Sequence, residues 1–133
     1  TREVRIHSSI ALLEELAQAH PVCIVSGADR EHVDHGIELA GVAPLLAFSL
    51  SGDDFAPPKP DPTCYRMASE KLGRGPGECL VFEDSAAGVK AAKAAGAHCV
   101  ALARPGRPPQ DLSAADWVLD DLGRFSPAAY AHR

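Results

Sequence analysis

Three short runs of consecutive apolar residues constrain the fold of this chain more than any other feature of its sequence. The runs are residues 22–25, 79–82 and 99–102. A strand that is apolar on both faces is typical of a parallel sheet covered by helices on both sides. Segments with helical patterns surround these runs, at residues 8–19, 29–40, 61–72 and 86–95. The alternation predicts an α/β fold: a doubly wound, mostly parallel sheet with helices on both faces.

Local signals set the expected boundaries of the remaining elements. Ser8 or Ser9 is expected to cap the first helix, and Asp29 the second. Clusters of proline and glycine predict loops, whereas short apolar runs predict further strands. On this basis we expect strands at residues 45–50 and 117–119, loops at residues 51–62 and 104–109, and a weak helix near residues 121–130.

The composition restricts the class of partner. The chain has the size of a single domain, and we expect residues 1–133 to form one α/β core. A net charge of −5 argues against nucleic acid as a partner. No apolar run approaches the roughly 20 residues that cross a bilayer, so no membrane association is expected. The charged start and four cysteines without a Cys-x-x-Cys pair favour a cytoplasmic location with reduced thiols.

Polar residues follow the predicted strands at the edge where parallel α/β sheets bind ligands. Ser26 and Gly27 follow the first strand, and a hydroxyl with exposed backbone N–H groups can hold phosphate oxygens. Lys59 lies among prolines after the second strand and supplies a positive charge for a phosphoryl group. Glu83 and Asp84 follow the third strand and are the oxygen ligands that Mg²⁺ prefers. Together these groups suggest phosphoryl transfer.

Each of these residues also has a structural interpretation when it is taken alone. Ser26 is then a cap at the end of a strand, and Lys59 is a solvated loop lysine. Glu83 and Asp84 are then carboxylates that stabilise a helix N-terminus. All of them follow predicted parallel strands in sequence order, which favours a shared site over three unrelated structural roles.

The motifs resemble those of the haloacid dehalogenase-like (HAD) hydrolases, and in particular their phosphatase and β-phosphoglucomutase branch. The resemblance covers about residues 8–104. The segments that carry it are Val25-Ser26-Gly27, Lys59-Pro60-Asp61-Pro62 and Phe82-Glu83-Asp84-Ser85 with Gly88. It implies that Ser26 and Gly27 bind the transferring phosphoryl group and that Lys59 neutralises it. It further implies that Asp84 binds Mg²⁺ with help from Glu83, and that the substrate is a small phosphorylated metabolite.

One motif of the family is absent from these residues. Its Asp-x-Asp motif supplies the nucleophile that forms an aspartyl-phosphate and the general acid/base. The only acidic residues before Ser26 are Glu3, Glu14 and Glu15. The helical cap domain of the family is absent too. The missing strand normally lies between the strands that end at Ser26 and Asp84, so we expect a gap in the sheet with unpaired strand edges.

Three explanations of this gap are open, and each makes the chain alone catalytically inactive. The sequence is a fragment of a longer protein, which we favour, or the missing N-terminal part is a separate chain. Otherwise the sheet closes up in a non-catalytic relative. The sequence does not identify the substrate, and it does not separate phosphatase, phosphomutase and dehalogenase chemistry.

Other classes of function fit some of the same residues. A phosphate- or metal-binding module without chemistry would use the same residues. A response-regulator receiver domain is disfavoured because Lys59 precedes the acidic pair. His32 and His35 are one helical turn apart, but a solvated helix face explains them better than a metal site. We also expect Lys59→Ala to weaken phosphate binding far more than stability, because a loop lysine packs little.

Overall fold

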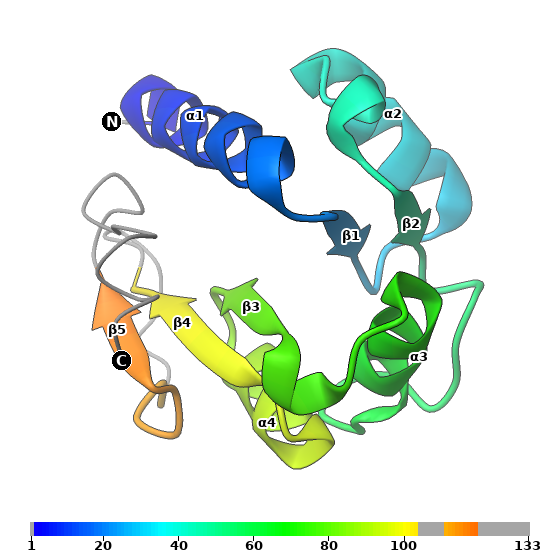
Figure 1. Ribbon diagram of the computed structural model, residues 1–133, viewed down its shortest axis with the longest axis vertical. Coiled ribbons are helices and arrows are strands. Elements are labelled where there is room, and N and C mark those ends of the chain that lie inside the picture. The colour runs from blue at the N-terminus through cyan, green and yellow to red at the C-terminus, as the bar shows by residue number, and fades with distance from the viewer. Residues whose placement is uncertain (1, 104–110, 120–133) are drawn as a thin grey trace.

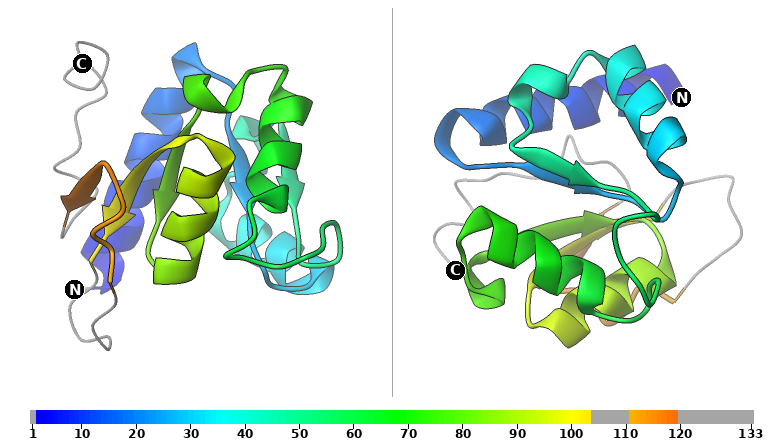
Figure 2. Two further views of the ribbon diagram at one scale, coloured as in Figure 1. Left: turned by 90° about the horizontal axis from the view of Figure 1, so that it is seen from below. Right: turned by 90° about the vertical axis from the view of Figure 1, so that its right-hand side faces the viewer.

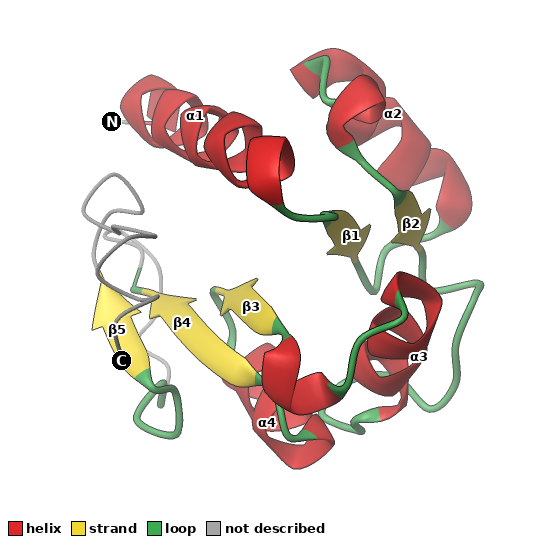
Figure 3. Cartoon of the chain, viewed as in Figure 1, coloured by secondary structure: helices red, strands yellow, loops and turns green. Residues whose placement is uncertain are grey.

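Helices alternate with parallel strands along the chain. The structure is a computed structural model, and it describes residues 2–103 and 111–119. The helices are α1 (Arg2–Ala19), α2 (Arg30–Ala40), α3 (Thr63–Leu72) and α4 (Ala86–Ala95), with short 3₁₀ turns at Ala43–Leu45 and Pro76–Glu78. The strands are β1 (Cys23–Val25), β2 (Phe48–Leu50), β3 (Leu80–Glu83), β4 (His98–Leu102) and β5 (Trp117–Leu119). The order confirms the predicted α/β fold class (Figures 1 and 3).

The described strands form two separate parallel sheets. β1 pairs with β2, so that Val25 lies opposite Leu50. The second sheet has the order β3-β4-β5, with Glu83 opposite Ala101. Within residues 2–103 and 111–119, β1 pairs only with β2, and β3 pairs only with β4. The expected gap therefore lies between β1 and β3, and the predicted sheet is present as two pieces.

Helices lie on both sides of the strands. α1 and α2 lie on one side, and α3 and α4 lie on the other (Figure 2). The core cluster contains many small side chains, among them the fully buried Cys64, Val89 and Cys99. Burial raises the pKa of Cys99 to about 12, as expected for a thiol that acts as a small apolar side chain. Small residues at these positions let α4 pack closely on the sheet.

Capping residues set most helix boundaries as expected. Asp29 accepts a hydrogen bond from the backbone N–H of His32 at 2.8 Å, which caps α2. Gly41 ends α2 in the left-handed conformation, at φ 69°. α1 is different, because it begins at Arg2 and places Ser8 and Ser9 inside the helix. The expected cap at these serines is wrong, since neither glycine nor proline interrupts the chain before Pro21.

The second strand is shorter than expected. It begins at Phe48, because Pro44 initiates a 3₁₀ turn that includes Leu45. The edge strand at Trp117–Leu119 is confirmed, in parallel with β4. The expected loop at residues 104–109 and the expected helix near residues 121–130 lie outside the described residues. In the described part of the chain, no helix combines the length and apolarity needed to span a membrane.

Candidate functional site

A polar pocket of about 410 Å³ lies at the carboxyl ends of β1 and β3. Parallel strands end at the same edge of a sheet, which brings together residues that are distant in sequence. Its lining residues come from both sheets and from the Lys59 loop. They are Val25, Ser26, Gly27, Lys59, Phe82, Glu83, Asp84, Ser85 and Leu102. All five site residues predicted from the sequence line this one pocket.

The loop after β1 supplies Ser26 and Gly27. The backbone N–H of Ser26 donates to Leu50 at 2.9 Å, and the Ser26 hydroxyl accepts from the backbone N–H of Ala28 at 3.1 Å. A Cβ at Gly27 would meet no heavy atom within 4 Å, apart from its chain neighbours. The backbone at Gly27 is therefore open to an approaching ligand, while Ser26 also holds its own loop.

The loop after β2 packs against the Ser26 loop. The backbone N–H of Gly52 donates to Ala28 at 2.6 Å. A Cβ at Gly52 would lie 2.3 Å from the carbonyl oxygen of Gly27, so only glycine allows this approach. The backbone N–H of Ser51 and then Arg30 lower the pKa of Asp54 to about 2. These contacts fix the β2 loop against the site.

Lys59 is held in place by two acceptors. Its Nζ lies 2.5 Å from Glu83 Oε2 and 3.3 Å from the carbonyl oxygen of Val25. Its side chain is only 16% exposed. The interpretation of Lys59 as a solvated loop lysine that packs little is therefore wrong. The ammonium is the partner of a buried carboxylate.

The Glu83 side chain is largely enclosed, at 8% exposed. The same Oε2 atom that accepts from Lys59 also accepts from the phenol of Tyr65. Burial and then the neighbouring Glu83 raise the pKa of Tyr65 above its usual range, so the phenol stays a donor. A Cβ at Gly88 would lie 2.0 Å from the Glu83 carboxyl carbon, so this carboxylate rests against the first turn of α4.

Asp84 and Ser85 complete the acidic end of the pocket. The Ser85 hydroxyl accepts from the backbone N–H of Gly88 at 3.0 Å and caps α4. Two adjacent carboxylates are the protein ligands that Mg²⁺ typically combines with water and phosphate oxygens. The donor set of Glu83 and Asp84 fits that pattern. No cluster of three or more His, Cys, Asp or Glu in residues 2–103 and 111–119 forms a larger metal site.

Some residues near the site were not predicted from the sequence. Two of them are Tyr65 and Gly52, for which the sequence predicts only a helix at residues 61–72 and a loop at residues 51–62. The signal for Tyr65 was available, because a buried tyrosine needs a hydrogen-bond partner for its hydroxyl.

His32 and His35 are exposed on α2, and His32 Nδ1 lies 2.7 Å from Asp29 Oδ1.

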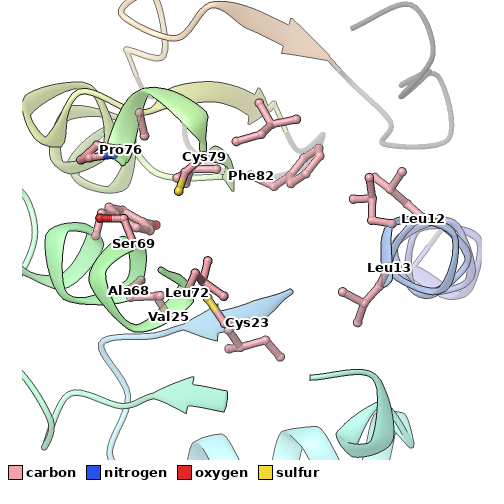
Figure 4. Close-up of a pocket in the computed structure, with 16 residues that line it drawn as sticks. Leu12, Leu13, Cys23, Val25, Ala68, Ser69, Leu72, Pro76, Cys79 and Phe82 are labelled. Carbon is pink, nitrogen blue, oxygen red and sulfur yellow. The ribbon is translucent and has the colours of Figure 1, made fainter. Parts of the chain in front are cut away.

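An apolar cavity of about 320 Å³ lies in the gap between β1 and β3 (Figure 4). Leu12 and Leu13 of α1 line it on one side. Val25 of β1, Leu72 of α3 and Phe82 of β3 are among the residues that line its other sides. Burial raises the pKa of Cys23, another lining residue, to about 11. The two sheet edges therefore face apolar space next to the polar pocket.

Comparison with known proteins identifies the family. A sequence model described as haloacid dehalogenase-like hydrolase matches residues 3–96, well over half of the chain. The chain belongs to this family. The HAD resemblance of the motifs is thereby confirmed, and the similar proteins include Protein CbbY.

Several relatives of this HAD chain are phosphatases or bind sugar phosphates. Validoxylamine A 7'-phosphate phosphatase from Streptomyces hygroscopicus subsp. limoneus is 34% identical over 120 residues, 90% of this chain and 56% of that protein. Protein CbbY from Rhodobacter capsulatus is 44% identical over 132 residues, 96% of this chain and 58% of that protein. A CbbY variant from Rhodobacter sphaeroides in complex with xylulose-(1,5)bisphosphate has a TM-score of 0.78 and 27% identity, covering 86% of this chain and 52% of that one. The chain thus spans about half the length of these relatives.

Proposed function

We propose that this chain carries the phosphate-binding and metal-binding part of a Mg²⁺-dependent HAD phosphatase or phosphomutase. The observation that supports the proposal is the polar pocket itself, where Ser26, Lys59 and Asp84 come from three separate segments. The substrate is a small phosphorylated metabolite. The nucleophilic aspartate comes from a strand outside these 133 residues.

In this proposal Ser26 and Lys59 bind the phosphoryl group. The open backbone at Gly27 offers N–H donors to phosphate oxygens, and the Ser26 hydroxyl adds another polar contact. The ammonium of Lys59 has three donors. In the described part of the chain Nζ bonds to Glu83 and Val25, which leaves one donor for a ligand. A cation held this way stabilises the charge that develops during phosphoryl transfer.

In the proposal Asp84 holds the metal, and Glu83 only assists, because its Oε2 is already bonded to Lys59 and Tyr65. Bound Mg²⁺ supplies positive charge that neutralises the phosphoryl oxygens and orients the group. Asp84 directly follows β3, and Glu83 precedes it on the strand, so the strand end places both carboxylates at the pocket. Ser85 fixes the first turn of α4 and keeps this segment in place.

The gap between the two sheets supports the proposal that a strand from outside this sequence fits between them. In the described part of the chain β1 and β3 are not paired with each other, and an apolar cavity lies between them. A parallel strand inserted there ends at the same edge as β1 and β3. A carboxylate that follows such a strand lies next to Lys59 and Asp84, where a nucleophile is required.

The similar proteins support a sugar phosphate as the substrate class. One relative is named a phosphatase for a 7'-phosphate, and the CbbY structure holds a pentulose bisphosphate. The polar pocket, of about 410 Å³, has room for a phosphoryl group and the part of the substrate bonded to it.

The test is an extended protein that includes an Asp-x-Asp strand. This strand is taken from the coding sequence upstream of Thr1 or, failing that, from Rhodobacter capsulatus CbbY. Release of inorganic phosphate is measured with a panel of sugar phosphates. We expect turnover that requires Mg²⁺ and that drops by at least about 100-fold in Asp84→Asn, since metal and phosphate contacts each contribute several kcal/mol.

The 133-residue chain and a matched surface variant are the controls. Asp34→Asn removes a carboxylate on α2 that pairs with Arg30 and does not line the pocket, so it should keep full activity. No Mg²⁺-dependent turnover in the extended protein would leave the alternative, a phosphate- or metal-binding module without chemistry. Turnover by the 133-residue chain alone, lost in Asp84→Asn, would contradict the external nucleophile.

A further inference from the structure

Two donors from different elements meet on one carboxylate oxygen in the site. Glu83 Oε2 accepts from Lys59 Nζ at 2.5 Å and from the Tyr65 phenol. Glu83 and Tyr65 are both 8% exposed, so water contributes little to either group. When a buried carboxylate loses one hydrogen-bond donor, it interacts more strongly with the donor that remains.

Tyr65 also contacts the cation directly. Lys59 Nζ lies 5.1 Å from the centroid of the Tyr65 ring, within the range of a cation–π interaction. The ring packs against the ammonium, and the hydroxyl bonds to the carboxylate that the ammonium pairs with. Tyr65 thus touches both members of the ion pair, although it does not line the polar pocket.

Resting on the proposed function, we propose that Tyr65 is a positioning residue that keeps the Lys59 ammonium available to a bound phosphoryl group. The phenol shares the charge on Glu83 Oε2, so that Lys59 is not the sole donor to this atom. Its remaining N–H is then free to bond to the ligand. When the phenol is absent, the buried carboxylate draws the ammonium toward itself and weakens its bond to the anion.

The experiment measures binding of inorganic phosphate to the 133-residue chain in the presence of Mg²⁺, by isothermal titration calorimetry. Tyr65→Phe keeps the ring and removes only the hydroxyl. Ser69→Ala is the matched control, because Ser69 is a buried hydroxyl one turn further along α3 that donates to Arg66 at 3.0 Å. Lys59→Met removes the cation. Thermal melting of each variant reports stability separately.

We expect Tyr65→Phe to weaken phosphate binding roughly three- to tenfold, the scale of one ordinary hydrogen bond, because the phenol acts on the ligand only through Glu83 and Lys59. The phosphate affinity of Ser69→Ala should stay within about twofold of that of the parent chain, even if its melting temperature falls as far as that of Tyr65→Phe. Phosphate affinity of Tyr65→Phe equal to that of the parent, with binding lost in Lys59→Met, overturns the positioning role and leaves the proposed function intact. Absence of phosphate binding in the parent chain overturns the phosphate site, and the role of Tyr65 with it.

Discussion

At the scale of single residues, the site depends on one buried carboxylate. Glu83 connects a lysine from the loop after β2, a tyrosine from α3 and the first turn of α4. A charge with so little exposure is tolerated only when it is paired and hydrogen-bonded. The ion pair with Lys59 is therefore part of the folded structure as well as of the candidate site.

Removal of Lys59 should destabilise the protein. Lys59→Met leaves Glu83 buried without its counter-charge, and we expect the free energy of unfolding to fall by about 3 kcal/mol. Adding Glu83→Gln should recover much of this loss, because the uncompensated charge is gone. Urea denaturation of the single and double variants measures the coupling.

A second ion pair in the same chain provides the control. Lys93 and Asp116 lie 2.9 Å apart, but their side chains are 33% and 30% exposed. Lys93→Met should therefore cost less than about 1 kcal/mol. Equal losses for Lys59→Met and Lys93→Met, with no recovery in the double variant, would show that burial of Glu83 does not make its charge costly.

The positions of the site residues could be predicted because they depend on topology. Ser26 and Asp84 follow apolar strands, and the carboxyl ends of parallel strands meet at one edge. The partners of these residues could not be predicted in the same way. Tyr65 and Glu83 are 18 positions apart and meet only in the folded chain. Helical periodicity predicts a helix that contains Tyr65, but it does not say which polar group the Tyr65 hydroxyl contacts.

At the scale of elements, the loops after β1 and β2 act as one unit. Gly52 approaches the Gly27 carbonyl so closely that an added Cβ would lie 2.3 Å away from it. The obstructing atom belongs to the backbone, which cannot rotate aside as a side chain can. The β2 loop thus sets the position of the loop that is proposed to hold phosphate.

Substitution of Gly52 should disturb both loops. We expect Gly52→Ala to lower the free energy of unfolding by about 1–3 kcal/mol, the cost of overpacking. NMR chemical shifts of Ser26 and Gly27 should move with it. Gly77→Ala is the control, because a Cβ at Gly77 meets nothing within 4 Å. Unchanged stability and unchanged Ser26 shifts in Gly52→Ala would mean that the two loops are independent.

Element boundaries were predictable where a local signal defines them. Asp29 and Gly41 delimit α2 through hydrogen bonds within a few residues of each helix end. α1 has no such signal at its start, so its extension to Arg2 was not expected from the apolar periodicity that begins at Ile10. The shortened β2 likewise depends on how residues 43–47 pack, beyond their apolar character.

At the scale of the whole molecule, the two sheets formed by the described residues both contribute to one pocket but do not pair with each other. β1 and β3 face each other across the apolar cavity, and the polar pocket lies at their carboxyl ends. Several predicted strands were found, but periodicity within a sequence cannot supply a strand that the sequence does not contain. The gap followed instead from the family resemblance and the missing Asp-x-Asp motif.

A peptide that forms the missing strand should bind in this gap. We expect an apolar peptide ending in Asp-x-Asp to raise the melting temperature of the 133-residue chain by several degrees, because ligand at 100 times its Kd adds about 2.7 kcal/mol of stability. The same peptide with a central proline lacks one backbone donor and cannot pair on both sides. It should shift the melting temperature much less. Equal shifts for the two peptides would indicate nonspecific apolar contact, and no shift for either would contradict insertion of a strand between β1 and β3.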